Sequence, residues 1–444
     1  MGTSFLPYDP NQLYLLPPSP SDWLPEGHLA LFVSDMVDRL DLREFYARYE
    51  GDGRRNQPNS PTMMVKVLVY AYASGVFSSR QIANRLHEDV AFRVLGAGNF
   101  PAHRTICDFR GLHLEELKAL FVQVVGVARE LGLVKLGVLG VDGTKIRANA
   151  SKHKAMSYGR MKEEQARLKA EMGELLQRAE RVDRAEDERL GADASGESLP
   201  EDLKRREERL AKIEAAKARL EARQREADEA RGRHEDDGCK PTQGDGRGSR
   251  FKREFGVPED KAQENFTDPL SRIMKTQEGY QQCYNAQAGV DGESQLIVAT
   301  GLTHCASDNA QLLPMVKVAA HNVGTKPALV LADAGYRCEE SFVALEQQGI
   351  EALVALGRDG KAALNLDAER SPASARMLQT LNTEAGKARY RRRKVIPEPV
   401  FGWIKHVLGF RRFSLRGLHK VTAEWNLVCL AVNLKRMQVL LRPA

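Results

Sequence analysis

The stretch LGVLGVDGTKI, Leu136 to Ile146, is the point at which the chain changes from helical to strand-like patterning. Its valine, leucine and isoleucine residues favour a buried β-strand, which the pattern predicts to end at Asp142-Gly143. Helical patterns precede it, and two long charged helices and then further strands follow it. The stretch therefore predicts the first strand of an α/β domain.

Strands resume at Gly279. GYQQCYNAQAGVD (279–291) and SQLIVATGLTH (294–304) predict a strand pair, and ALVLADAGY (328–336) and IEALVALG (350–357) predict two more strands that alternate with helices. The apolar segment TAEWNLVCLAVNLKRMQVLL (422–441) predicts a last helix that closes the core. This alternation indicates a mixed α/β sheet.

Residues 159–190 and 200–233 predict two long helices that interrupt this domain. Their apolar residues recur at near-heptad intervals within mixed charge, which is typical of an antiparallel hairpin with a narrow seam. The seam residues are Leu168, Met172, Leu175, Val182, Leu203, Leu210, Ile213 and Leu220. We predict three parts: a helical domain over 1–128, an α/β domain over 129–150 and 265–444, and a charged insertion over 151–264. A solvated structural arm is favoured over a catalytic role for the insertion.

The N-terminal region has the layout of a helix-turn-helix. Ser78 or Ser79 can cap one short helix, a break follows at 96–99, and Pro101 opens a second helix. In such motifs the start of the second helix enters the major groove of DNA, which makes His103, Arg104 and Arg110 candidate DNA contacts. Many helical hairpins have this pattern without binding DNA, so the motif alone leaves both interpretations open.

Charge gives independent support for a polyanionic partner. The net charge is only +6, but residues 389–420 hold ten Lys and Arg and a single acid, Glu398. A second basic region covers 54–113, with eight Lys and Arg against three acids. Two separate basic regions suggest nucleic acid held at two places, with Arg411 and Arg412 among the phosphate contacts. An acid inside a cationic field is explained if a divalent metal lies between it and a phosphate.

Three acids are candidate metal ligands. Asp142 and Asp333 are predicted at the ends of strands, where α/β sheets bind ligands, and Glu398 at the start of a helix. Two Mg²⁺ ions about 4 Å apart can clamp the attacking and leaving oxygens in phosphoryl transfer. Lys405 is two helical turns after Glu398, on the same face, and suits a phosphate beside the scissile bond.

Each acid also has a structural interpretation. Asp142-Gly143 suits a hairpin turn, Asp333 can cap the next turn, and Glu398 can oppose a helix dipole with Pro399 at the first helical position.

Composition excludes several classes. The six cysteines form no CxxC pair, and we interpret them as reduced thiols. No apolar run approaches the roughly 20 residues of a membrane helix, and no signal peptide pattern is present, so we expect no membrane partner and a cytoplasmic location with association to the nucleoid.

Long segments of the chain resemble bacterial insertion-sequence transposases of the DDE superfamily, closest to the subgroup with a charged helical insert after the first strand. These are GVDGTKIRANASKHKAMSYGRM, NFTDPLSRIMKTQEGYQQCYNAQAGVD, LADAGYR and EPVFGWIKHVLGFRRFSLRGLHKVTAEWNLVCLAVNLKR. The resemblance implies an RNase H-like catalytic core, a helical DNA-binding domain, and Asp142, Asp333 and Glu398 as the metal-binding triad. Mn²⁺ is expected to substitute for Mg²⁺.

The resemblance also implies accessory roles for Tyr390, Arg393 and Lys405, as in the family's Tyr-Arg-Glu-Lys signature. The spacing between arginine and glutamate is one residue longer here, so Lys394 is an alternative to Arg393. The implied activity is cleavage at the inverted-repeat ends of a mobile element and transfer of the 3′-hydroxyl ends to target DNA by at least a dimer. A transposase-derived DNA-binding protein without catalysis and a Mg²⁺-dependent nuclease without strand transfer are the alternatives.

Overall fold

A computed structural model describes residues 19–49, 57–190, 201–235, 253–357 and 367–442. Residues 1–18 and the stretch between the two predicted arm helices, 191–200, lie outside these ranges. No helix in the described ranges is long and apolar enough to cross a membrane.

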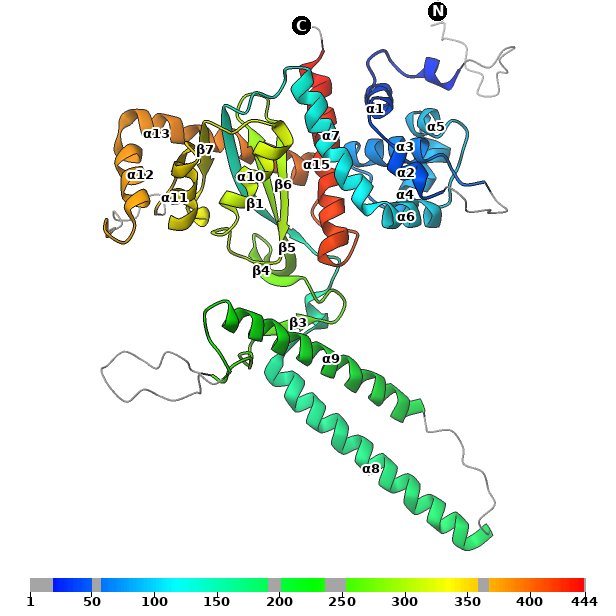
Figure 1. Cartoon of the computed structure of the whole chain (residues 1–444). Helices are drawn as coiled ribbons and strands as arrows, with labels where there is room; N and C mark the ends of the chain where they lie inside the picture. Colours follow the sequence, from blue (N-terminus) through cyan, green and yellow to red (C-terminus); the bar gives the residue numbers. More distant parts are fainter. Residues whose placement is uncertain (1–18, 50–56, 191–200, 236–252, 358–366, 443–444) are drawn as a thin grey trace, which may run out of the picture.

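The centre of the molecule is a six-stranded mixed sheet (Figure 1). Strand β1 (Val138–Arg147) lies between β5 (Gly279–Asp291), which is antiparallel to it, and β7 (Leu329–Ala332), which is parallel. Strand β8 (Glu351–Val354) extends the sheet beyond β7, also in parallel. Strands β4 (Arg272–Thr276) and β6 (Ile297–Thr303) pair with successive parts of the other side of β5.

The predicted end of the first strand at Asp142-Gly143 is wrong. Strand β1 continues to Arg147, with Asp142 opposite Ala288 of β5 and Gly143 opposite Gln287. A hairpin turn at these residues is therefore excluded. The pattern misled because the polar residues Thr144 and Lys145 look like a loop, whereas they line the partly exposed half of a strand.

Helices cover both faces and the far edge of the sheet (Figure 1). Their bounds are α10 (Leu312–Val323), α11 (Glu339–Gln347), α12 (Pro372–Asn382), α13 (Glu384–Arg391), α14 (Pro397–Gly402) and α15 (Leu418–Leu440). Helices α11, α12 and α13 gather at the β8 edge. Between α14 and α15 the chain forms a π-helical segment, Trp403–Val407.

Helix α15 is the buried helix that the sequence predicted, and its polar side chains attach it to the sheet. Trp425 Nε1 donates a 3.0 Å hydrogen bond to the carbonyl of Gln287 in β5. The Asn433 amide both accepts from the backbone N–H of Ile297 at 2.8 Å and donates to its carbonyl at 2.7 Å. Because these two bonds satisfy backbone groups of β6, they protect an edge of the sheet.

In the described residues seven α-helices precede the sheet, and the first, third and seventh of them pack against α15 (Figure 1). They are α1 (Leu29–Asp38), α2 (Arg43–Ala47), α3 (Pro61–Ala73), α4 (Ser79–Glu88), α5 (Val90–Gly96), α6 (His103–Leu112) and α7 (Leu114–Glu130). The two helices of the predicted helix-turn-helix are α4 and α6. Helix α5 was not predicted as a separate helix. It starts after Asp89, whose side chain caps it by accepting from the backbone N–H of Ala91.

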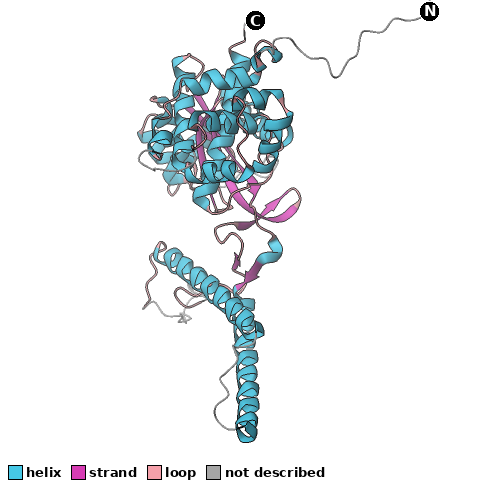
Figure 2. Cartoon of the chain, turned by 90° about the vertical axis from the view of Figure 1, so that its right-hand side faces the viewer, coloured by secondary structure: helices cyan, strands magenta, loops and turns pink. Residues whose placement is uncertain are grey.

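A long helical arm projects from one end of the sheet (Figure 2). It consists of α8 (Tyr158–Leu190) and α9 (Glu201–Glu229), and a small ribbon of β2 (Ala155–Ser157) and β3 (Gln263–Asn265) forms its base. Leu168, Ile213 and Leu220 of the predicted seam are buried in a separate apolar cluster.

Glu424 of α15 should be a main determinant of stability. Its carboxylate accepts from the Tyr72 hydroxyl and from the backbone N–H groups of Ser414 and Leu415, and it lies near the buried Arg110 guanidinium. We expect Glu424→Ala to lower the free energy of unfolding by about 3–5 kcal/mol, because it leaves a buried cation uncompensated and also removes the acceptor of three hydrogen bonds. Urea denaturation measures this. Glu424→Gln, which keeps an acceptor, should cost less, and an equal loss in both variants would contradict the account.

Candidate active site

The parallel pairing of β1 and β7 brings two of the predicted acids to one level of the sheet. Gly140 pairs with Leu331, and each acid lies two residues further along its strand direction, Asp142 within β1 and Asp333 just after β7. Both side chains are partly buried. Asp333 Oδ1 also accepts a 2.8 Å bond from the backbone N–H of Gly335, so the predicted capping role is present as well.

The electrostatics of Asp142 reflect this neighbourhood. Burial raises the pKa of its carboxyl to about 6, and the negative charges of Asp333 and Asp308 act in the same direction. The backbone N–H of Gly143, which donates to Asp142 Oδ1 at 2.8 Å, and the Arg393 guanidinium oppose the rise. Asp142 is thus a carboxylate held among other acids, which a cation would stabilise.

The segment that carries Glu398 packs closely against Gly140 of β1. A Cβ on Gly140 would lie 2.7 Å from Ile396 Cγ2 and 3.0 Å from the Pro397 ring, so only glycine lets the start of α14 pack there. Pro397, and not Pro399 as predicted, is the first residue of the helix, and Glu398 follows in its first turn. The glutamate therefore lies on a segment that packs directly against the strand of Asp142.

Arg393 occupies the region between Glu398 and Asp142. Its Nη2 lies 3.3 Å from Glu398 Oε1, and its charge acts on Asp142. In the described part of the chain no three His, Cys, Asp or Glu side chains lie close enough to hold a metal ion as they stand. The carboxylate donors suit a hard divalent cation, but Glu398 would have to leave Arg393 to join the two aspartates.

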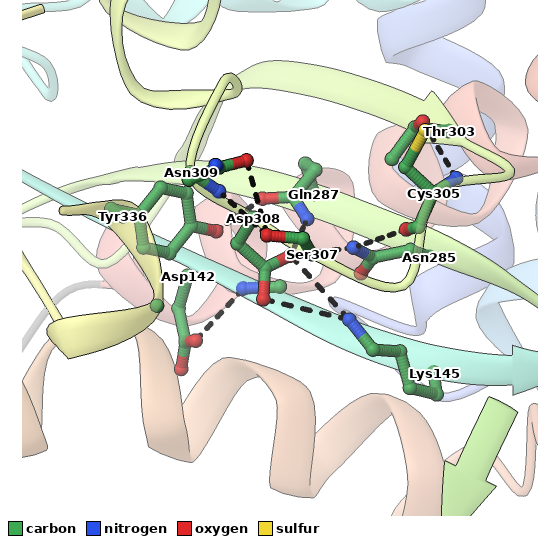
Figure 3. Close-up of polar contacts among 12 residues, drawn as sticks. Asp142, Lys145, Asn285, Gln287, Thr303, Cys305, Ser307, Asp308, Asn309 and Tyr336 are labelled. Carbon is green, nitrogen blue, oxygen red and sulfur yellow. Dashed lines mark hydrogen bonds and ion pairs between the residues drawn. The ribbon is translucent and has the colours of Figure 1, made fainter. Parts of the chain in front are cut away.

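Asp308, which the sequence analysis missed, is a third aspartate at this site (Figure 3). Its Oδ1 accepts from the side-chain amides of Asn285 at 2.5 Å and Gln287 at 2.7 Å, and Lys145 Nζ lies 3.4 Å away. A Cβ built on Gly335 would be 3.4 Å from Asp308 Oδ2 and 3.0 Å from Asp333 Oδ1. The two oxygens are therefore at most 6.4 Å apart, the sum of those distances.

The charges at this site also act on the buried Tyr336. Its hydroxyl hydrogen-bonds to Gln287, and burial, followed by the charges of Asp308, Asp142 and Asp333, raises its pKa above the usual value. The pKa of one tyrosine thus responds to the charges of all three aspartates. No sequence pattern distinguished Asp308, which lies in the connection between β6 and α10.

A basic groove of about 470 Å³ runs beside Asp142, and we call it the active-site groove. Its charged lining comprises five Lys and Arg, one His and one Glu: Lys145, Arg147, Lys275, Glu278, Lys405, His406 and Arg411. The predicted Lys405 lies here, and burial lowers the pKa of its ammonium group. The same-face argument for Lys405 assumed an unbroken α-helix, whereas the chain changes to a π-helix at Trp403.

The other predicted contacts near Glu398 take different positions. The Tyr390 hydroxyl donates to the carbonyl of Ala332 at 3.3 Å, directly before Asp333, and Arg393 stacks over its ring at 6.0 Å. Arg411 lines the active-site groove and contacts His406. The Arg412 side chain is exposed, and its backbone forms an isolated parallel β-bridge with the backbone of Arg147 in β1. Lys394 is exposed.

In the N-terminal region two of the three predicted contacts face solvent. His103 and Arg104 are exposed at the start of α6. Arg110 is buried, and its guanidinium donates to the Tyr72 hydroxyl at 2.8 Å and to the carbonyl of Phe77 at 3.2 Å. Its assignment as a DNA contact is therefore corrected: it lies on the core face of α6 and holds the helices together.

Asp142→Asn should stabilise the protein without bound metal. Above pH 6 the wild-type carboxylate is ionised when folded and unfolded, and its burial costs stability; below its unfolded value near 3.8 it is protonated in both states. We expect the variant to be about 1–2 kcal/mol more stable at pH 7.5, after allowance for partial exposure, and the gain to vanish near pH 4. Urea titrations in EDTA measure it. A gain independent of pH would contradict the assignment.

Two family models match the chain. The model described as Transposase DDE domain matches residues 249–434, which include Asp333 and Glu398 but begin after Asp142, and the model described as Transposase domain (DUF772) matches residues 18–112. No curated protein and no solved structure gives a significant match. Such enzymes cleave and join DNA and generally use divalent metal ions. Both domains are characteristic of insertion-sequence transposases of the DDE superfamily, and the chain is similar to this family over both matched regions.

Proposed function

We propose that the protein binds the inverted-repeat ends of its own insertion sequence, cleaves phosphodiester bonds there and transfers the 3′-hydroxyl ends to target DNA. The observation that carries the proposal is the placement of Asp142 and Asp333 at one level of neighbouring parallel strands, with the active-site groove beginning at Gly143, the residue after Asp142. Acids that lie just beyond the parallel-paired part of two strands suit metal binding, and a basic groove suits a phosphate backbone.

Asp142, Asp333 and Glu398 would hold two Mg²⁺ ions, which Mn²⁺ can replace. Bound there, such ions activate the attacking oxygen and stabilise the charge on the leaving oxygen. Glu398 becomes available when its ion pair with Arg393 opens, and a DNA phosphate is a suitable new partner for the arginine. The same site then serves cleavage and strand transfer, and no side chain has to act as a nucleophile.

The cations around the site have separate tasks in this scheme. Lys405 and Arg411, which both line the active-site groove, would hold phosphates next to the scissile bond. Tyr390 would fix the backbone before Asp333 through its bond to Ala332. Arg412 and Lys394, both exposed, would contact phosphates further from the reacting bond.

The N-terminal helices would recognise the end sequence, with His103 and Arg104 at the start of α6 entering the major groove. Pairing of two ends requires two active sites, so a dimer or larger assembly on DNA is expected. We assign the core to the RNase H-like fold, with the arm as an insertion, on the support of a central strand β1 that has an antiparallel neighbour on one side and a parallel one on the other.

A nicking assay on a supercoiled plasmid that carries the element ends tests the proposal. With Mg²⁺, wild-type protein should nick the plasmid, and Glu398→Gln should reduce the rate by more than about 100-fold, because even loss of an outer-shell partner costs 10–100-fold. Binding of end DNA, measured by fluorescence anisotropy, should persist. Glu293→Gln, an exposed acid that pairs with Lys135, is the matched control and should nick at the wild-type rate.

One observation favours a DNA-binding protein without catalysis, namely that no three described acids are close enough to hold an ion. If wild type and Glu398→Gln bind end DNA equally and neither nicks, that alternative is correct. Cut ends that are never joined to a target would instead indicate a nuclease.

A further inference from the structure

The base of the helical arm has a second basic groove, which we call the arm groove. It has a volume of about 430 Å³ and lies between the β2–β3 ribbon and the starts of α8 and α9. Its charged lining again comprises five Lys and Arg, one His and one Glu: His153, Lys154, Arg160, Arg205, Glu208, Arg209 and Lys212. All seven side chains are exposed to solvent.

This charge is not a general property of the arm. Helix α9 as a whole is balanced, with nine Lys and Arg and nine Asp and Glu over residues 201–229. Residues 205, 208, 209 and 212, at spacings of three and four, form one face of the helix, and three of these four are cations. The positive residues of this turn are thus concentrated on the side that faces the ribbon.

The cations of the arm groove are only partly neutralised within the protein. Arg209 pairs with Glu164 at 2.8 Å. Lys154 and Lys212, by contrast, make no ion pair with any residue that the structure describes. Arms that only need solubility pair their charges along the helix, as Lys217 does with Glu221 in α9. Unpaired cations in a concave surface suit an anionic ligand from outside the chain.

The arm groove lies within reach of a duplex bound at the active site. Arg147, in the active-site groove, and His153, in the arm groove, are six residues apart, so their Cα atoms are separated by at most about 21 Å. One turn of B-DNA is about 34 Å long. Both grooves can therefore contact phosphates within a single helical turn, and both views of the chain place the arm base next to the sheet (Figures 1 and 2).

We propose that the arm groove binds the phosphate backbone of the same DNA duplex that enters the active-site groove. The helical arm is then a DNA-holding element rather than only a structural insertion. This inference rests on the proposed function, because it assumes that DNA occupies the active-site groove. The ligand is duplex backbone and not a base sequence, since lysine and arginine contacts to phosphates do not depend on sequence.

The test compares two triple variants that remove the same charge. Lys154→Gln, Arg160→Gln and Lys212→Gln remove three of the five lysine and arginine charges of the arm groove, whereas Arg181→Gln, Lys204→Gln and Arg231→Gln remove three exposed arm cations outside it. The probes are fluorescein-labelled duplexes of 16 and 40 base pairs with arbitrary sequence, titrated by anisotropy between 50 and 200 mM salt. Circular dichroism and the plasmid-nicking rate accompany each titration.

We expect the arm-groove variant to bind the 40-base-pair duplex roughly tenfold more weakly at low salt. The slope of the logarithm of the binding constant against the logarithm of the salt concentration should fall in magnitude by about 0.9 for each phosphate that the protein no longer neutralises. Its binding to the 16-base-pair duplex should weaken as well, because that duplex is longer than the separation of the two grooves, and the control variant should match wild type with both. If the arm-groove variant binds the long duplex as wild type does, or if the control variant weakens binding equally, the proposal is overturned. Wild-type nicking with either result leaves the proposed function standing, whereas a wild-type protein that neither binds nor nicks DNA defeats both.

Discussion

The structure around the candidate site depends on a repulsion, since Asp142 and Asp333 are held side by side by the parallel pairing of β1 and β7. Burial and the neighbouring acids raise the pKa of Asp142, so the fold maintains negative charge where it costs free energy. The surrounding cations offset part of that cost: Arg393 acts on Asp142, and Lys145 contacts Asp308. Sites that are unfavourable for the empty protein and suited to a cation or substrate are expected of enzymes, because stability is exchanged there for function.

The candidate site also requires that neighbouring segments lie very close to the backbone of β1. Gly140 leaves room for Ile396 and Pro397, and a Cβ on Gly143 would collide with the Gln287 amide, which lies 2.3 Å from that point. The two glycines near Asp142 therefore serve different contacts. Gly140 leaves space for the segment that carries Glu398, and Gly143 leaves space for the Gln287 side chain. Trp425 of α15 holds the backbone of Gln287 through the hydrogen bond to its carbonyl. Packing of the last helix thus supports the position of side chains at the site.

The sequence predicted most of the fold because hydrophobic periodicity determines the long elements. The strands around Tyr284 and Val330, the arm helices and the buried helix around Trp425 all followed from apolar spacing. The misses have local causes. The continuation of β1 past Gly143 depends on pairing with a strand more than a hundred residues away, and the π-helix at Trp403 has no distinct pattern. Asp308 and Arg110 were misjudged because only tertiary contacts reveal that one joins the acidic site and the other is buried.

The arm is attached to the molecule by two short connections, one leaving β1 after Arg147 and one entering β4 at Arg272. Side chains stiffen the first of them: Asn149 Nδ2 donates to the carbonyl of Ser414 at 2.7 Å, and Asn265 Nδ2 donates to that of Ser151 at 2.7 Å. These bonds tie the base of the arm to the segment that follows β1, the strand that holds Asp142. A change in the direction of the arm would therefore be passed on to that strand and to the position of its aspartate.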